Sequence, residues 1–188
     1  MKARIFISHA DKDKVLASCF VEALKSAFSL TNSEIICTSY AQTRIPNGVA
    51  IADFLKEQFQ NADFVFYLIT ANFIESANCM VEFAWHINKP LSDKYLFSFE
   101  GVNFQKLPTM LNGYHITPFD SCGLKEAWAK LCAKFEAKTT IEKWLQLCQN
   151  SSEENKSAIT VPISEPHPCS YGSIKRRGAR RPQSKGIM

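Results

Sequence analysis

A glutamate and a cysteine lie three residues apart in a segment whose spacing predicts a helix over residues 78–88. Cys79 and Glu82 therefore share one face of that helix, and Ser76 lies just before it. A glutamate on a helix flank is usually a solvated surface charge, and a cysteine is usually a small packed side chain. A catalytic pair of Cys79 and His86 is disfavoured because seven residues separate them by two full helical turns. The location of Glu82 relative to the sheet therefore decides what it can do.

Ser8 and His9 are the second group with chemical potential. They follow the apolar run Ile5–Ile7 directly, at the junction between a predicted strand and a predicted helix. The two residues fit either the lining of a pocket or the cap of the following helix. Without an orienting acid, we do not expect them to act as a nucleophilic pair.

A loop predicted over residues 39–48 contributes two further candidates. Arg44 can contact a pyrophosphate or a neighbouring subunit, or it can simply be solvated. Gly48 meets a backbone requirement at the start of the next helix, where it also leaves N–H groups open to a phosphate.

Short apolar runs alternate with amphipathic segments along the chain. The runs predict strands, and the strongest of them, over residues 63–70, carries six apolar residues without a break, which is typical of a strand buried on both faces. We expect an α/β fold of the flavodoxin-like class, with an open parallel five-stranded sheet of order 2-1-3-4-5 and helices on both faces. Strands are expected over residues 4–8, 33–38, 63–70, 94–99 and 114–117, and helices over 11–29, 51–59, 78–88 and 124–135, the last continuing toward 147; Asp11 or Asp13 is available as the first helix cap.

In such a sheet, ligands bind beyond the carboxyl ends of the strands, at the point between strands 1 and 3 where the strand order reverses. That rule selects the loops 8–10 and 70–72. The loop after strand 2 lies beside the first of them, and the helix after strand 3 brings Ser76, Cys79 and Glu82 to the same rim.

Three sequence motifs lie at these positions. Residues 5–13 read I-F-I-S-H-A-D-K-D, residues 44–48 read R-I-P-N-G, and residues 76–82 read S-A-N-C-M-V-E. In order and spacing they resemble the three boxes of TIR (Toll/interleukin receptor) domains of the bacterial type, such as Thoeris-like defence proteins. The resemblance covers roughly residues 3–136.

The resemblance implies an enzyme that cleaves the nicotinamide–ribose bond of NAD+, giving nicotinamide and ADP-ribose or a cyclic isomer, in prokaryotic defence or signalling. NAD+ is then the substrate, and no other cofactor is expected. Glu82 is implied to be catalytic. The residues expected to bind substrate are Ser8, His9, Thr38, Arg44, Gly48, Ser76 and Cys79.

One carboxylate is compatible with this reaction. Nicotinamide leaves a cationic ring as a neutral base, so no general acid is required, and a nearby carboxylate can stabilise the charge that develops on the ribose. Hydrolysis of ordinary O-glycosides normally uses a pair of carboxylates.

An alternative is a non-catalytic module that acts by TIR–TIR self-association, and this association is also expected of the enzyme. Asn78 stands where the family usually has an aromatic residue, which favours the alternative. Trp85, one turn beyond Glu82, can supply an aromatic wall or be plain core.

The net charge of +4 separates the chain into two parts. Residues 1–150 are neutral, and the whole excess lies in residues 151–188, which hold seven basic and three acidic residues and half of the eight prolines. We expect a TIR domain over residues 1–149 and a disordered, solvated tail over residues 150–188. A nucleic-acid partner is expected only through that tail. With no signal peptide and no apolar run long enough to span a membrane, the expected location is cytoplasmic, without a membrane partner.

Other functional classes lack their motifs. The sequence has no G-x-G-x-x-G or Walker-type loop, which excludes an ordinary dehydrogenase or NTPase. No histidine pair has metal spacing, so no metal site is expected. A receiver domain needs an acidic cluster after strand 1 and an aspartate after strand 3, where this chain has Ser8 and Thr70.

Overall fold

Five parallel strands form one sheet in the order β2-β1-β3-β4-β5, as the sequence predicted. The computed structural model describes residues 4–40, 48, 50–87 and 92–153, with the side chains of 149–153 excepted. β1 and β3 are neighbours although β2 lies between them in sequence, and this reversal creates the predicted binding edge. The strands are β1 (Ile5–Ser8), β2 (Ile35–Ile36), β3 (Phe64–Ile69), β4 (Asp93–Ser98) and β5 (Ile116–Pro118).

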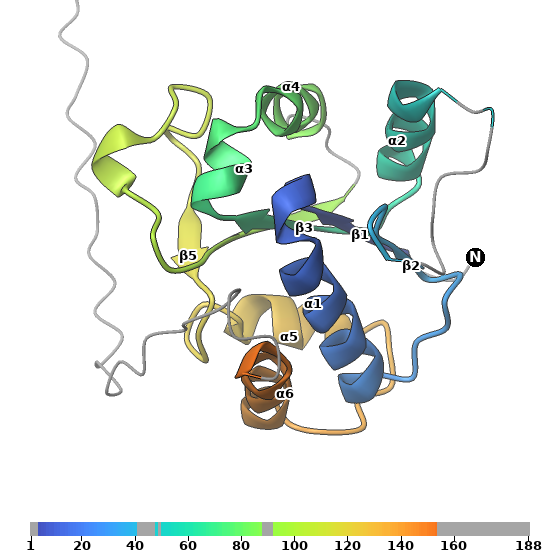
Figure 1. The fold of residues 1–188 in the computed structure, drawn as a ribbon. Coiled ribbons are helices and arrows are strands. Elements are labelled where there is room, and N and C mark those ends of the chain that lie inside the picture. The colour runs from blue at the N-terminus through green and yellow to red at the C-terminus, as the bar shows by residue number, and fades with distance from the viewer. Residues whose placement is uncertain (1–3, 41–47, 49, 88–91, 154–188) are drawn as a thin grey trace, which may run out of the picture.

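Helices cover both faces of the sheet (Figure 1). One face carries α2, α3 and α4, and the other carries α1, α5 and α6. A 3-10 turn, η1 (Asp11–Asp13), leads into α1, and another, η3 (Phe104–Lys106), lies between β4 and β5. The helices are α1 (Lys14–Ala27), α2 (Ile51–Gln60), α3 (Ala71–Glu75), α4 (Ala77–His86), α5 (Lys125–Cys132) and α6 (Ile141–Glu153).

β3 is the central strand, and all six of its residues are buried. Alternate side chains of a strand point to opposite faces, so β3 divides its residues between two cores. Phe64, Phe66 and Leu68 pack on the α1 side, whereas Val65, Tyr67 and Ile69 pack on the α4 side. Tyr67 is therefore the polar side chain that this apolar run delivers toward α4.

The carboxyl end of the sheet is held in register by the central pair of strands. Ser8, the last residue of β1, lies opposite Tyr67 of β3. Because both strands run the same way, the residues that follow them, His9 and Thr70, emerge at the same edge of the sheet. This arrangement brings the first and third motifs together.

Two helices form where the sequence predicted one continuing from residue 124 to 147. α5 ends at Cys132, and α6 begins at Ile141. The segment between them pairs with the end of α1 instead: Ala137 forms an antiparallel bridge with Phe28, and the Lys138 amide donates to the Ala27 carbonyl. The apolar positions 124–147 keep a helical period across this break, so periodicity alone could not find it.

The helix predicted over residues 78–88 is α4, and a short additional helix that the sequence did not predict, α3, precedes it and ends at Glu75. At the other end of the domain, α6 continues to Glu153 and so crosses the boundary predicted between 149 and 150. Residues 154–188, the rest of the predicted tail, lie outside the described residues.

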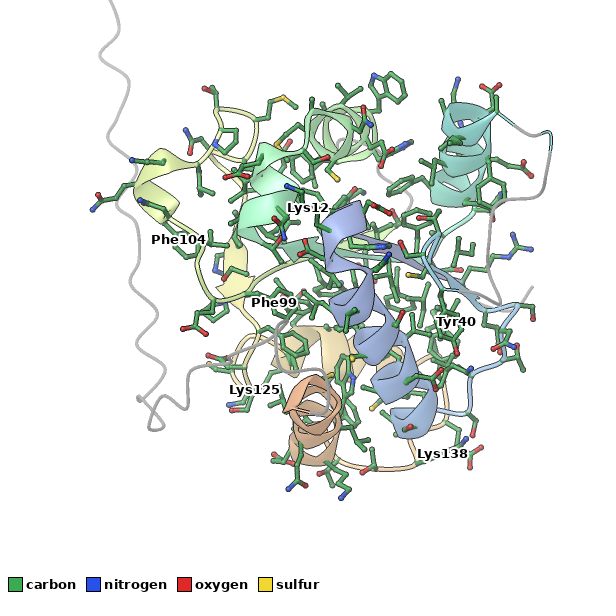
Figure 2. All side chains as sticks on the ribbon, viewed as in Figure 1. Lys12, Tyr40, Phe99, Phe104, Lys125 and Lys138 are labelled. Atoms are coloured by element: carbon green, nitrogen blue, oxygen red, sulfur yellow. The ribbon has the colours of Figure 1, made fainter. Side chains whose placement is uncertain are left out.

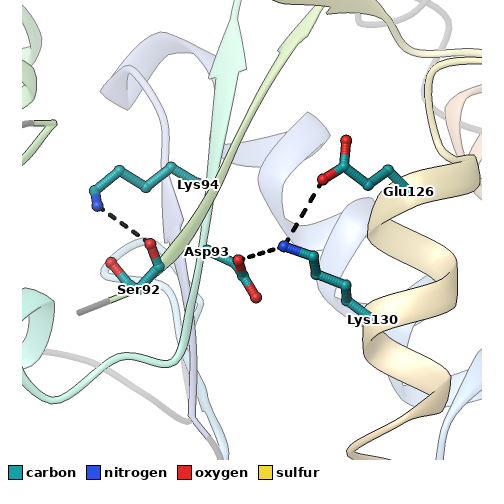
Figure 3. Close-up of polar contacts among 5 residues, drawn as sticks. All are labelled: Ser92, Asp93, Lys94, Glu126 and Lys130. Carbon is teal, nitrogen blue, oxygen red and sulfur yellow. Dashed lines mark hydrogen bonds and ion pairs between the residues drawn. The ribbon is translucent and has the colours of Figure 1, made fainter. Parts of the chain in front are cut away.

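An ion pair joins α5 to the start of β4 (Figure 3). Lys130 Nζ lies 2.6 Å from Asp93 Oδ1 and 3.7 Å from Glu126 Oε1, and the Lys94 ammonium donates to the Ser92 carbonyl at 3.2 Å. The side chains of Lys130 and Asp93 are each more than two fifths exposed, so the pair contributes only about 0–1 kcal/mol. Packing of the apolar cores, not surface charge, holds the helices in place.

Candidate functional site

The end of β1 places Ser8 and His9 at the reversal point of the sheet. Ser8 is buried, with 4% of its surface exposed, and it belongs to the strand, so it is not the cap of the first helix. His9 is partly buried, and burial is the main cause that lowers the pKa of its imidazole. His9 is therefore predominantly uncharged at neutral pH, so it can accept a proton but does not supply a positive charge to the site.

The His9 ring is fixed by contacts on both nitrogens. Nε2 lies 2.6 Å from Ser39 Oγ, and Nδ1 faces the Ile7 carbonyl oxygen at 3.4 Å, with Cys37 Sγ 3.9 Å away. A carbonyl oxygen can only accept, so Nδ1 carries the proton of the neutral ring. Nε2 then accepts a hydrogen bond from the Ser39 hydroxyl.

The turn that follows β2 supplies this serine. Tyr40 anchors the turn to α1: its hydroxyl donates to Glu22 and accepts from Lys25 Nζ at 3.2 Å (Tyr40 is labelled in Figure 2). Thr38, predicted to bind substrate, is partly buried in the same turn, next to Ser39. The contact between His9 and Ser39 joins residues thirty positions apart and depends on the pairing of β1 with β2, so the sequence analysis did not find it.

α4 carries the residues of the third motif. Ser76 is its N-cap, with the side-chain oxygen accepting from the Cys79 amide at 3.3 Å. Cys79 is buried, its Sγ donates to the His9 carbonyl at 3.7 Å, and burial raises the pKa of its thiol. A buried thiol with a raised pKa is a poor nucleophile, so Cys79 acts as a packed contact between α4 and the loop after β1, as the sequence suggested.

Glu82 lies one turn beyond Cys79 and is partly buried. Burial raises the pKa of its carboxyl, and its charge in turn acts on the Cys79 thiol and the Tyr67 hydroxyl. No hydrogen bond or ion pair joins the Glu82 carboxylate to another side chain in the described part of the chain. A partly desolvated carboxylate whose oxygens remain available can act strongly on a positive charge brought beside it.

Tyr67 is a site residue that the sequence analysis missed. Its side chain is fully buried, and among the described residues its hydroxyl has no hydrogen-bond partner. Burial, followed by the charge of Glu82, raises the pKa of this hydroxyl. Within an unbroken apolar run a tyrosine resembles a core residue, and only the structure shows that its hydroxyl lies within electrostatic range of the Glu82 carboxylate.

Asp13 also has a different role from the one predicted. It makes no side-chain cap of α1; its two carboxylate oxygens accept instead from the Thr70 hydroxyl at 2.5 Å and from Asn72 Nδ2 at 2.6 Å. Thr70 is the N-cap of α3 and accepts from the Phe73 amide at 3.0 Å. Charge-assisted bonds to two donors stabilise the carboxylate better than one exposed helix amide would. The start of α1 is thereby tied to the end of β3, beside His9.

The second motif is only partly described. Gly48 is exposed with a φ of 82°, a left-handed conformation that favours glycine, and it precedes α2. Because glycine has no side chain, Gly48 can contact a ligand only through its backbone. Arg44 lies outside the described residues. Ser8, His9, Ser76, Cys79 and Glu82 therefore gather at one edge, with Thr38 beside Ser39.

Two positions on α4 bear on the departure from the family pattern. Asn78, at the position usually aromatic, is exposed at the start of the helix. Trp85 is 55% exposed, so it is not core, and its neighbour one turn earlier, Val81, is 46% exposed. Trp85 therefore lies on the exposed side of α4, whereas Phe83 of the same helix packs in the core.

Neither a metal site nor a membrane-spanning helix is found in the described ranges. No group of three His, Cys, Asp or Glu side chains there is placed to hold a metal ion. No helix in the same ranges has the length and apolar character needed to cross a membrane.

Comparisons with known proteins show which family the chain resembles. A family model described as the TIR domain matches residues 5–132. The chain is also 28% identical over 154 residues to the uncharacterized protein YddK of Bacillus subtilis (strain 168), a match that covers 73% of this chain and 58% of YddK. The chain thus spans less than two thirds of that relative.

A solved structure supports the fold. The TIR domain of the Toll-related receptor TRR-2 from Hydra magnipapillata superposes with a TM-score of 0.50 and 11% sequence identity, covering 69% of this chain and 94% of that chain. At that identity the likeness concerns the fold alone. Together with the family match, which spans more than half of the sequence and all three motifs, it shows that the chain belongs to the TIR domain family.

Proposed function

We propose that this TIR domain cleaves the nicotinamide–ribose bond of NAD+, with Glu82 as the catalytic carboxylate. The observation that carries the proposal is the state of Glu82: partly buried, with a raised pKa, and without a bond to another described side chain. In the reaction, the bond between ribose C1′ and the nicotinamide nitrogen breaks, and its electron pair leaves with nicotinamide. Positive charge then develops on the ribose, where a carboxylate stabilises it.

The other residues at the edge serve binding. His9, whose pKa is lowered by burial, offers a flat, uncharged polar wall beside the position expected for the ribose. Gly48, exposed just before α2, is suited to the pyrophosphate, because exposed backbone N–H groups bind phosphate oxygens. The products are nicotinamide and ADP-ribose or a cyclic isomer, and we place the activity in prokaryotic defence or signalling.

The test incubates the purified chain with NAD+, with and without a crowding agent that promotes assembly. Released nicotinamide is measured by chromatography. Glu82→Gln keeps the size of the side chain and removes its charge, so the rate should fall by about 10²–10³. Binding of NAD+ should weaken much less, because the lost interaction forms mainly in the transition state. Glu75→Gln, an exposed glutamate seven residues earlier, is the matched control and should keep full activity. No release by the wild-type chain under either condition would refute the proposal.

A second candidate is a non-catalytic module that binds other TIR domains. The observation in its favour is the exposed pair Val81 and Trp85 on the outer surface of α4. Exposed aromatic side chains are enriched in protein interfaces. The two functions separate in a cell-based assay: full biological activity of Glu82→Ala favours the adaptor, and loss of activity with normal self-association favours the enzyme.

A further inference from the structure

Ser39 and His9 form a hydroxyl–imidazole pair that the proposed cleavage step does not use. The distance between Ser39 Oγ and His9 Nε2 is 2.6 Å, which is a strong hydrogen bond for these groups. Ser39 is partly buried, and its neighbours Cys37 and Tyr40 are buried. The pair is therefore held by a packed turn and still reaches the surface.

His9 has the properties of a general base for that hydroxyl. Its Nδ1 faces the Ile7 carbonyl, which leaves the Nε2 lone pair for Ser39, and its lowered pKa keeps it neutral. The carboxylates of Asp13 and Asp11 act on the ring with the opposite effect and favour its protonated form. These carboxylates would stabilise the imidazolium that forms when His9 takes a proton, as the aspartate does in a serine–histidine–aspartate triad.

We propose that Ser39 is a site of self-ADP-ribosylation, at which the serine hydroxyl captures the ribosyl group released from NAD+. This inference rests on the proposed function. The bond between C1′ and the nicotinamide nitrogen breaks, and nicotinamide leaves with the electron pair. Ser39 Oγ forms a new bond to C1′, and its proton passes to His9 Nε2 and then to solvent. Nicotinamide, an O-linked ADP-ribosyl serine and one proton are the products, and no further reactant is needed.

The contacts around the pair favour ribosyl capture over acyl transfer. Acyl transfer builds an oxyanion and needs donors aimed at it. Capture of a ribosyl cation builds none, so a hydroxyl and a base are sufficient. The pair is also linked to the proposed catalytic residue: Cys79, one turn before Glu82 on α4, contacts the His9 carbonyl, and the His9 ring contacts Ser39. A chain of contacts thus joins α4, the helix that carries Glu82, to the acceptor through His9.

The experiment incubates the full chain with NAD+ and measures released nicotinamide and covalent adducts in the same samples, by chromatography and by peptide mass spectrometry. An ADP-ribosyl group is expected on the peptide containing Ser39. Ser39→Ala should remove that adduct while nicotinamide release continues. Ser33→Ala is the control, because Ser33 is exposed and its hydroxyl bonds to that of Thr31, whereas the hydroxyl on His9 Nε2 is that of Ser39. His9→Gln, with folding checked by circular dichroism, should lower the adduct by about 100-fold, the lower end of what a positioned general base contributes.

The outcomes separate the two proposals. Nicotinamide release without an adduct on Ser39 overturns the self-modification and leaves the cleavage intact. No nicotinamide release overturns both. A parallel incubation with ADP-ribose in place of NAD+ detects simple chemical glycation, and an equal adduct there overturns transfer from NAD+. An adduct that persists in His9→Gln at the wild-type level refutes the role of His9 as the base.

Discussion

The hydroxyl of Tyr67, on the central strand, lies within electrostatic range of the Glu82 carboxylate on α4 and has no hydrogen-bond partner among the described residues. Burying a hydroxyl without a partner is unfavourable by about 1–3 kcal/mol. We infer that Tyr67 donates to Glu82 once substrate is bound, and that it acts in that complex as a positioning residue that favours the charged carboxylate.

Replacement of Tyr67 tests this role. Tyr67→Phe removes only the hydroxyl, so kcat should fall by about 10-fold or more, the worth of a hydrogen bond to a charged group, with little change in KM. Without the donor, the pKa of Glu82 in the substrate complex should be higher, so the acidic limb of the kcat profile should move to higher pH. Tyr95→Phe is the control, because Tyr95 is buried on the opposite face of the sheet. An unshifted pH profile in Tyr67→Phe would rule out the positioning role.

The raised pKa of Glu82 also predicts how stability depends on pH. The folded chain binds this proton more tightly than the unfolded chain does, because burial raises the pKa of the Glu82 carboxyl above its ordinary value. The stability that Glu82 contributes is therefore fully present below the pKa of its carboxyl in the unfolded chain. It is lost as pH rises through the higher pKa in the folded chain. Glu82→Gln should melt at a higher temperature than wild type at neutral pH, and the advantage should disappear in acidic buffer. A lower melting temperature of Glu82→Gln at neutral pH would contradict this prediction.

The Asp13 contacts predict a structural effect at the same edge. Asp13→Ala leaves the Thr70 hydroxyl, on a residue only 8% exposed, without its acceptor, so the free energy of unfolding should fall by about 1–3 kcal/mol. Asn72→Ala removes one donor and leaves the other bond, so it should have a smaller effect. Denaturant unfolding of both variants measures the difference. Equal losses would show that Thr70 does not depend on Asp13.

Much of the fold could be predicted because its signals are local. The apolar runs at β1 and β3 and the periodicity of α1 placed the sheet order and the edge that carries Ser8, His9 and Glu82. The break between α5 and α6 could not be found, because the chain leaves the helix to pair with Phe28, more than a hundred residues earlier. The partners of Asp13 and His9 were missed for the same reason: each contact joins separate elements and leaves no periodic trace.

The outward surface of α4 predicts a site of self-association. Trp85→Ser should weaken concentration-dependent assembly, since it removes the largest exposed apolar side chain on that helix. Phe104→Ser is the control, because Phe104 is 52% exposed but lies on η3, a different element from α4 (Figure 2). Sedimentation velocity over a dilution series measures both variants. Equal loss of assembly in the two would indicate general surface hydrophobicity instead of a defined interface.

The three tryptophans of the chain lie in three different environments, which gives the protein built-in optical reporters. Trp144 is fully buried, with ring centroids 5.6 Å from Trp128 and 5.8 Å from Phe20, so its fluorescence is blue-shifted while α6 stays packed on α1. Trp85, half exposed and one turn beyond Glu82, emits at longer wavelength and is open to quenchers. Quenching by acrylamide or iodide can therefore follow events near α4 while the blue-edge emission of Trp144 follows unfolding, in one unlabelled sample.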